Sequence, residues 1–275
     1  MIATSIREKI LYLTILLLLL LTFTAIPARA EVVFSEDFEG GWGTWYADNG
    51  VWQVGTPLAP TWCSGQCAGT ELNGNYGPDT DSRLVGPTVT LPTVTGFEEI
   101  HLRFQNWFSY SVADWGQVQV SVWDPLAGTW GAWVNVGASV ANTSGWSLKD
   151  VDLTAHAGKT LRIAFYHIAQ DDYWTGGTDV STGWYIDDVQ VVRMVPAFTG
   201  DFEAGWGNWG TDGGVWQVGT PTAGPAGCYT GSQCAGTVLD GNYPGDTESR
   251  LVSPTIQLPT VTGFEEIHLR FQNWF

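Results

Sequence analysis

The sequence lacks the short motifs that mark common catalytic sites. It has four histidines, and none lies in the His-Glu-x-x-His pattern of zinc peptidases. A Gly-x-Ser-x-Gly nucleophile turn and a glycine-rich phosphate loop ending in lysine are both absent. Adjacent carboxylates such as Glu98 and Glu99 would point to opposite faces of a strand, so they cannot flank one glycosidic bond. We therefore expect no enzyme within these residues, while a catalytic domain beyond residue 275 stays open.

Basic residues are scarce, since 11 lysines and arginines stand against 28 acidic residues and the net charge is −17. A protein that binds nucleic acid through its phosphates needs charge of the opposite sign. An anionic membrane surface is disfavoured for the same reason. The composition is typical of a soluble extracellular protein. It would also suit carboxylates held together by a cation such as Ca²⁺, which prefers oxygen ligands.

Long apolar runs are absent except for one, from Ile10 to Ile26. A short basic start precedes this run, and the small-residue pattern Ala-Arg-Ala follows at 28–30. These features predict that residues 1–30 are a secretory signal peptide, cleaved before Glu31. The alternative is an uncleaved membrane anchor, because the run is nearly long enough to span a bilayer. We expect a secreted or cell-surface protein with no membrane insertion after cleavage.

Cysteines are few and fall into two short pairs, Cys63 with Cys67 and Cys228 with Cys234. Export makes disulfides chemically reasonable. A zinc site would need four ligands, and neither pair has a second cysteine pair or a histidine nearby. The spacing also differs between the pairs, which a loop tolerates and a chelate does not. We therefore predict two local disulfides.

The stretch LPTVTGFEEIHLRFQNWF occurs twice, at Leu91–Phe108 and at Leu258–Phe275. Matching segments precede both copies at an offset near 165 residues, which is a whole domain rather than a solenoid repeat. We expect one domain over residues 31–195. The first half of a second domain would cover 198–275, an incomplete copy whose polypeptide continues beyond this sequence.

Apolar and polar residues alternate with a period of two along several segments, as expected for half-buried strands. The clearest are 100–104, 117–122 and 161–165, and no segment after residue 30 has a sustained helical period. His101 and His167 lie in such patterns and are expected on sheet faces. With 34 glycines and 13 prolines between short strands, the fold class is predicted to be all-β, a two-sheet sandwich of jelly-roll type.

Three segments of the first copy together resemble the MAM-type jelly-roll domain. They are 37–42 (DFEGGW), 82–87 (SRLVGP) followed by the strand 100–104, and 183–191 (GWYIDDVQV). More specifically, they resemble the bacterial form found beside secreted metallopeptidases of the immune inhibitor A type and in other exported surface proteins. That family implies a non-catalytic extracellular module for adhesion or recognition. The local cysteine pairs depart from the animal pattern and put a receptor-type role in doubt.

Jelly-roll modules of this kind often hold a structural Ca²⁺ where the first and last strands meet. The resemblance places that site at Glu39 and at Asp187 or Asp188, with Asp79 and Asp81 as further ligands. Adjacent carboxylates also repel each other unless a cation or protons intervene. The alternative is that Asp187 and Asp188 point to opposite faces of one strand, with no ion between them.

Tryptophan is abundant, with 16 residues. Trp42, Trp52 and Trp107 recur in the second copy, which favours a role in core packing. Other tryptophans lie beside turn signals, where exposed rings could stack on sugars; they are Trp62, Trp115, Trp130, Trp133 and Trp174. The alternative is that they close the ends of the sandwich.

These observations lead to three functional expectations. The first is a secreted adhesion or recognition protein built of tandem MAM-like sandwiches, possessing a structural calcium and binding an extracellular protein or glycan. The second is a carbohydrate-binding module. The third is the accessory region of a secreted hydrolase whose catalytic domain lies beyond residue 275.

Overall fold

The computed structural model describes residues 30–58, 63, 65–170, 179–261 and 267–275. The proposed signal peptide lies outside these residues, apart from Ala30. The chain divides into two compact units, Arg29–Pro196 and a second unit whose described part begins at Ala197. No helix among the described residues has the length and hydrophobicity needed to cross a membrane.

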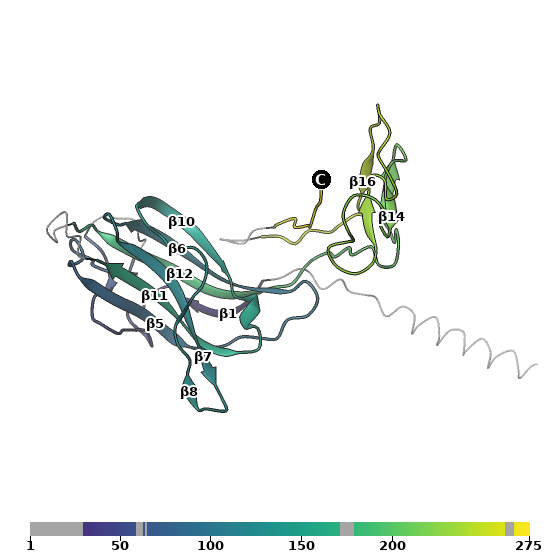
Figure 1. Cartoon of the computed structure of the whole chain (residues 1–275). Helices are drawn as coiled ribbons and strands as arrows, with labels where there is room; N and C mark the ends of the chain where they lie inside the picture. Colours follow the sequence, from purple (N-terminus) through teal and green to yellow (C-terminus); the bar gives the residue numbers. More distant parts are fainter. Residues whose placement is uncertain (1–29, 59–62, 64, 171–178, 262–266) are drawn as a thin grey trace, which may run out of the picture. The chain divides into compact units, whose positions relative to one another are not determined.

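The first unit is a sandwich of two antiparallel sheets (Figure 1), which confirms the all-β prediction. We call the sheets A and B. Sheet A has the order β10-β6-β12-β4-β3, with β1 also paired to β12. Its strands are β1 (Glu31–Glu36), β3 (Gln53–Gly55), β4 (Cys67–Gly69), β6 (Glu99–Ser109), β10 (Thr143–Asp152) and β12 (Gly183–Met194).

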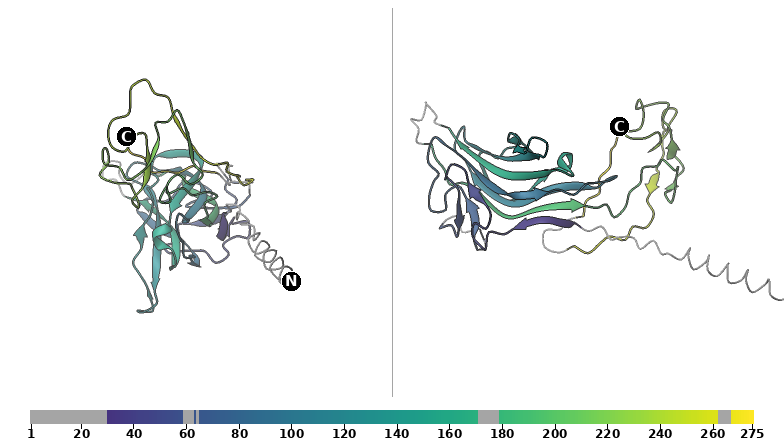
Figure 2. Two further views of the ribbon diagram at one scale, coloured as in Figure 1. Left: turned by 90° about the vertical axis from the view of Figure 1, so that its right-hand side faces the viewer. Right: turned by 90° about the horizontal axis from the view of Figure 1, so that it is seen from below.

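Sheet B has the order β2-β5-β11-β7-β8, and β9 also pairs with β7. Its strands are β2 (Tyr46–Ala47), β5 (Thr80–Thr90), β7 (Trp115–Asp124), β8 (Thr129–Trp130), β9 (Val134–Asn135) and β11 (Thr160–Ala169). A short 3-10 helix, η1 (Thr154–His156), connects β10 to β11. The two sheets lie face to face in the further views of the ribbon (Figure 2), so each has one face on the core and one outside.

Aromatic side chains fill the space between the sheets. Phe165 of β11 packs edge-on against Phe104 of β6 and Trp184 of β12, with ring centroids 4.9 and 5.5 Å apart. All three side chains are fully buried. Apolar residues at alternate positions of β7 and β11 also point into this core because successive side chains of a strand face opposite ways. Trp52 is buried with them, as its place in the repeat predicts.

Both predicted disulfides are present, Cys63–Cys67 and Cys228–Cys234. Cys67 lies on β4 and is buried in a small second cluster beside sheet A. This cluster contains Tyr185 and Trp107, whose rings meet edge-on at 5.5 Å. Trp107 therefore packs as the repeat predicts, outside the main core.

The second unit repeats local contacts of the first. Trp209 packs on Phe202 at 5.2 Å, as Trp45 packs on Phe38 at 5.4 Å. Its described strands are short and form two pairs: β13 (Gly210–Asp212) with β16 (Arg250–Val252), and β14 (Gln217–Gly219) with β15 (Cys234–Gly236).

The strand predicted for the second copy of the repeated stretch does not form in its described residues. Residues 267–275 are irregular, and Phe271 and Trp274 are exposed. In the first unit the same sequence forms β6, which is held between β10 and β12. Counterparts of β10 and β12 are not part of this sequence, so the second copy has no neighbouring strands to pair with.

His167 of β11 faces the core, on the apolar side of its strand. Its ring lies against Tyr76 and Tyr110, with centroids 4.8 and 5.6 Å away. Its nitrogens lie 3.1 Å from the Tyr110 hydroxyl and 3.2 Å from the Thr80 hydroxyl. Burial away from water disfavours the charged imidazolium and lowers the pKa of His167 to about 4.

This burial predicts a loss of stability in acid. Between about pH 6.5 and pH 4, His167 is protonated in the unfolded chain but stays neutral in the folded core. The free energy of unfolding therefore falls by about 1.4 kcal/mol for each pH unit of acidification. The free energy of unfolding can be measured by urea denaturation at pH 7 and at pH 4.5. Between these pH values it should fall by about 2–3 kcal/mol less in His167→Gln than in the natural protein.

His101→Gln is the matched control for this experiment. Hydrogen bonds and charges of Asp150 and Glu99 raise the pKa of His101, although its burial opposes them. The stability that His101 contributes is therefore present at low pH and is lost as pH rises. His101→Gln should accordingly steepen the acid loss. Equal pH profiles for His167→Gln and the natural protein would contradict the assignment.

Candidate functional site

The outer face of sheet B carries a concentration of polar and aromatic side chains. Since Leu84, Val118 and Phe165 point into the core, the residues next to them in sequence point outward. The outward set therefore comes from three neighbouring strands, with Arg83 on β5, Tyr166 on β11 and further residues on β7.

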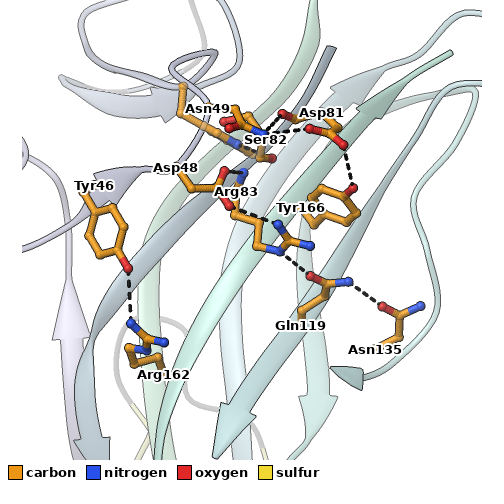
Figure 3. A network of polar contacts seen from close by, with 11 residues as sticks. Tyr46, Asp48, Asn49, Asp81, Ser82, Arg83, Gln119, Asn135, Arg162 and Tyr166 are labelled. Atoms are coloured by element: carbon orange, nitrogen blue, oxygen red, sulfur yellow. Dashed lines mark hydrogen bonds and ion pairs between the residues drawn. The ribbon is translucent and has the colours of Figure 1, made fainter. Parts of the chain in front are cut away.

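A chain of hydrogen bonds crosses the three strands (Figure 3). Arg83 Nη1 donates to Asp48 Oδ2 at 3.0 Å, and Arg83 Nε donates to Gln119 Oε1 at 2.7 Å. Gln119 Nε2 in turn donates to Asn135 Oδ1 at 2.8 Å. The Gln119 amide in the middle of this chain is buried, while Asp48 and Asn135 at its ends are exposed.

Asp81, one of the predicted calcium ligands, belongs to this face. Its carboxylate accepts hydrogen bonds from Asn49 Nδ2 at 2.8 Å and from the Tyr166 hydroxyl at 3.3 Å (Figure 3). The carboxylate of Asp81 is thus engaged on sheet B.

Aromatic rings and guanidinium groups alternate along the same face. The Arg83 guanidinium carbon lies 4.0 Å from the ring centroid of Tyr166 and 5.7 Å from that of Trp133. The Arg162 guanidinium carbon lies 4.1 Å from Trp130 and 5.5 Å from Trp133. Trp123 then meets Trp130 edge-on at 5.3 Å. We call this set the aromatic–arginine row; in order of contact it is Tyr166, Arg83, Trp133, Arg162, Trp130 and Trp123.

Every member of the row is partly exposed. Tyr46 adjoins it and is 46% exposed, with its hydroxyl accepting a hydrogen bond from Arg162 Nη1 at 3.2 Å. Cation–π contacts hold the rings in fixed positions without burying them. The row can therefore present flat apolar surfaces next to polar groups.

The structure brings together two of the five tryptophans predicted to contact a ligand. Trp130 and Trp133 belong to the row, whereas Trp115 begins β7 and lines a hollow together with Val112 and Asp114. Trp62 and Trp174 lie outside the described residues.

Sequence reasoning missed several members of this face, namely Tyr46, Arg83, Trp123, Arg162 and Tyr166. The period-two pattern of the strands did contain a signal for these residues, in its polar positions. The residues of 161–165 were assigned to a strand by their apolar half, and the polar half of the same pattern marks the outer face. Grouping the polar halves of β5, β7 and β11 would have found Arg83, Arg162 and Tyr166.

The acidic residues predicted at the start and end of the sandwich do influence one another. The pKa of Asp187 is raised to about 7, chiefly by burial and also by the charges of Asp188, Glu39 and Asp37, against a backbone hydrogen bond from Asp188. The pKa of Asp188 is raised by burial and by the charges of Asp37 and Glu39. Asp37 is a member of this group that the sequence analysis did not include.

Geometry supports a metal site here only in part. Glu39 Oε1 accepts a hydrogen bond from the backbone nitrogen of Gln66 at 3.0 Å, which ties it to the cysteine loop. Glu203 makes the same bond to Gln233 in the second copy. Asp79 and Asp81 do not contribute to the charges that raise the pKa of Asp187. Within the described ranges no three acidic, histidine or cysteine side chains are arranged to hold a metal ion.

No family model matches the chain. Bacillopeptidase F of Bacillus subtilis (strain 168) is 30% identical over 162 residues, which is 57% of this chain and 10% of that protein. The chain thus spans about a tenth of the length of this curated relative.

One similar solved structure is the CBM22-1 xylan-binding domain of Xyn10C from Paenibacillus barcinonensis. It is 17% identical in sequence, with a TM-score of 0.37, and the match covers 62% of this chain and 98% of that domain. The K3 cleaved adhesin domain of Lys-gingipain from Porphyromonas gingivalis w83 has 20% identity, a TM-score of 0.37, and coverage of 60% and 100%. At these TM-scores the similarities assign no function to this chain. The MAM-type family stays a prediction.

The row predicts a measurable effect on stability. Trp133 lies between two guanidinium groups, so Trp133→Ala removes two cation–π contacts and should lower the free energy of unfolding by about 1–3 kcal/mol. Trp133→Phe, which keeps a weaker aromatic face, should recover part of this loss. Urea denaturation measures both. A Trp133→Ala variant as stable as the natural protein would show that the row is not held by these contacts.

Proposed function

We propose that the first unit is a carbohydrate-binding module and that the outer face of sheet B is its binding surface. The observation that carries this proposal is the aromatic–arginine row, with partly exposed rings beside fixed amides and hydroxyls. Aromatic faces stack on the apolar faces of sugar rings, and the neighbouring polar groups bond to sugar hydroxyls.

The polar groups around the row suit such a ligand. Asn135 is exposed, and its hydrogen bond from the buried Gln119 orders its amide before a ligand arrives. Tyr46 adds an exposed ring and a hydroxyl at the edge of the sheet. Prior ordering of these groups lowers the entropic cost of binding.

A role in a longer secreted hydrolase is a second candidate, favoured by the similarity to a segment of Bacillopeptidase F. In that role the sandwich would hold the larger protein on a glycan-bearing surface. Both candidates place the same binding face on the same sheet, so one experiment addresses the face itself.

Trp130→Ala tests the binding face. Titration of the protein with a panel of soluble neutral and acidic polysaccharides should reveal binding, and loss of the Trp130 ring should weaken it roughly tenfold or more. Trp146→Ala on β10 of sheet A is the matched control, because Trp146 is also a partly exposed tryptophan. Absence of binding to every polysaccharide, or equal losses in both variants, would refute the proposal.

We also propose that Ca²⁺ stabilises the first unit by neutralising the carboxylates near Asp188. The support is the mutual repulsion of Asp37, Glu39 and Asp188, together with a hollow lined by Asp37 and Asp188. Oxygen ligands of this kind suit Ca²⁺. These side chains would supply carboxylate oxygens to the ion.

Melting of the protein with Ca²⁺ and with chelator tests this second proposal. A ligand that binds only the folded state adds about 2.7 kcal/mol at a hundredfold excess over its dissociation constant, so the Tm should rise by several degrees. Asp188→Asn should abolish the rise, and Asp79→Asn should leave it intact. The same Tm with and without Ca²⁺ would count against a structural ion.

A further inference from the structure

Arg162 differs from the other arginines of the first unit. Three of the four described arginines pair with a carboxylate: Arg83 with Asp48 at 3.0 Å, Arg103 with Asp150 at 3.4 Å and Arg193 with Glu98 at 2.8 Å. Arg162 has no carboxylate partner among the residues that the structure describes. In a protein with a net charge of −17, a guanidinium without an acidic neighbour is an exception to the local pattern.

The donors of Arg162 are only partly used. Its Nη1 donates to the Tyr46 hydroxyl, and its Nε is buried and meets no acceptor within the described part of the chain. A guanidinium has five N–H donors and no acceptor atom. Figure 3 shows Arg162 bonded to Tyr46 and separate from the hydrogen-bond chain on Arg83. Because Nε is buried, the donors of Arg162 that remain for a ligand are the N–H groups on Nη2 and the second N–H of Nη1.

Aromatic rings determine how Arg162 is held. Trp130 lies 4.1 Å from its guanidinium carbon and Trp133 lies 5.5 Å away. Contact with these faces restricts the orientation of the planar guanidinium. Little further conformational freedom would therefore be lost when a ligand binds. Arg83 has similar aromatic contacts, but Asp48 already neutralises it. The two arginines of the row are thus chemically distinct.

The group that complements a planar guanidinium is a planar carboxylate, which can accept two parallel hydrogen bonds. On a surface built to stack sugar rings, the source of such a carboxylate is a sugar acid. We propose that the ligand of this face is an anionic glycan containing uronic acid residues. Arg162 binds the uronate carboxylate, and Trp130 and Trp133 contact the sugar rings. This inference rests on the proposed carbohydrate-binding function and specifies its ligand class.

The acidic character of the protein does not oppose this assignment at the site. Asp48 is paired with Arg83, and Asp81 accepts hydrogen bonds from Asn49 and Tyr166. Charges farther away than a Debye length, which is about 8 Å at physiological ionic strength, are largely screened. A uronate close to Arg162 therefore meets a local positive charge.

Methyl esters provide the sharpest test, because they remove the charge and keep the sugar ring. The natural protein is titrated with oligogalacturonate, oligoalginate and glucuronoxylan, each beside its methyl-esterified form. We expect at least one acid form to bind, with its ester roughly tenfold or more weaker. This comparison uses only the natural protein and does not depend on the folding of any variant.

Variants then assign the effect to one side chain. Arg162→Gln should lower affinity for the acid form by a larger factor than affinity for the ester, so that the difference between the two forms is lost. Arg162→Lys should recover part of the affinity, because it retains the charge but not the two-pronged geometry. Lys149→Gln on β10 of sheet A, with the same loss of charge, should bind as the natural protein does.

The outcomes separate this inference from the proposed function. Binding of neutral glycans alone, equal binding of acid and ester, or an unaffected Arg162→Gln variant would overturn the uronate assignment while carbohydrate binding stands. Competition by dextran sulfate as effective as that by the uronate glycan would also overturn it, since any polyanion would then suffice. If no glycan binds at all, both proposals fail together.

Discussion

The packing of Phe165 against Phe104 and Trp184 is the contact on which the first unit depends. It joins sheet B to sheet A through three fully buried rings. Because side chains alternate along a strand, placing Phe165 in the core also places Tyr166 outside. Strand β11 pairs with both β5 and β7. The choice of which β11 side chains face the core therefore determines, through the pairing register, which residues of β5 and β7 share the outer face. The buried aromatic contact therefore positions the exposed row.

Arginines on this face have two different roles. Arg83 is anchored by Asp48 and Gln119 and lies over Tyr166, so it serves to join neighbouring strands. Arg162 is held mainly by tryptophan faces, which contribute attraction but accept few of its hydrogen bonds. The Arg162 guanidinium is partly removed from water without acceptors for all of its N–H groups, which costs free energy. A ligand carboxylate that accepts hydrogen bonds from its Nη groups would reduce this cost. The difference between the two residues depends on the placement of one aspartate.

Sequence patterns correctly predicted those features that depend on residues close together in the chain. Period-two alternation gave the strands, and short cysteine spacing gave the disulfides. The row was not predicted because Arg83, Arg162 and Trp133 lie in distant segments, and pairing register alone decides whether they meet. The register of β11 on β5 even shifts between Arg162 and Ala164, which no local pattern shows. For the same reason Asp81 was grouped with Asp188, although it contacts residues of sheet B.

Comparison of the two copies separates the scaffold from the candidate site. Arg250 pairs with Asp212 at 2.6 Å in the second unit, as Arg83 pairs with Asp48 in the first. This ion pair forms without counterparts of β7 and β11, so it belongs to the scaffold of the first half-domain. Trp130, Trp133 and Arg162 come from the later half, which the second copy does not contain in this sequence. Within the first unit, the segment from Ser109 to Val195 thus supplies five of the six members of the row, and Arg83 comes from the duplicated part.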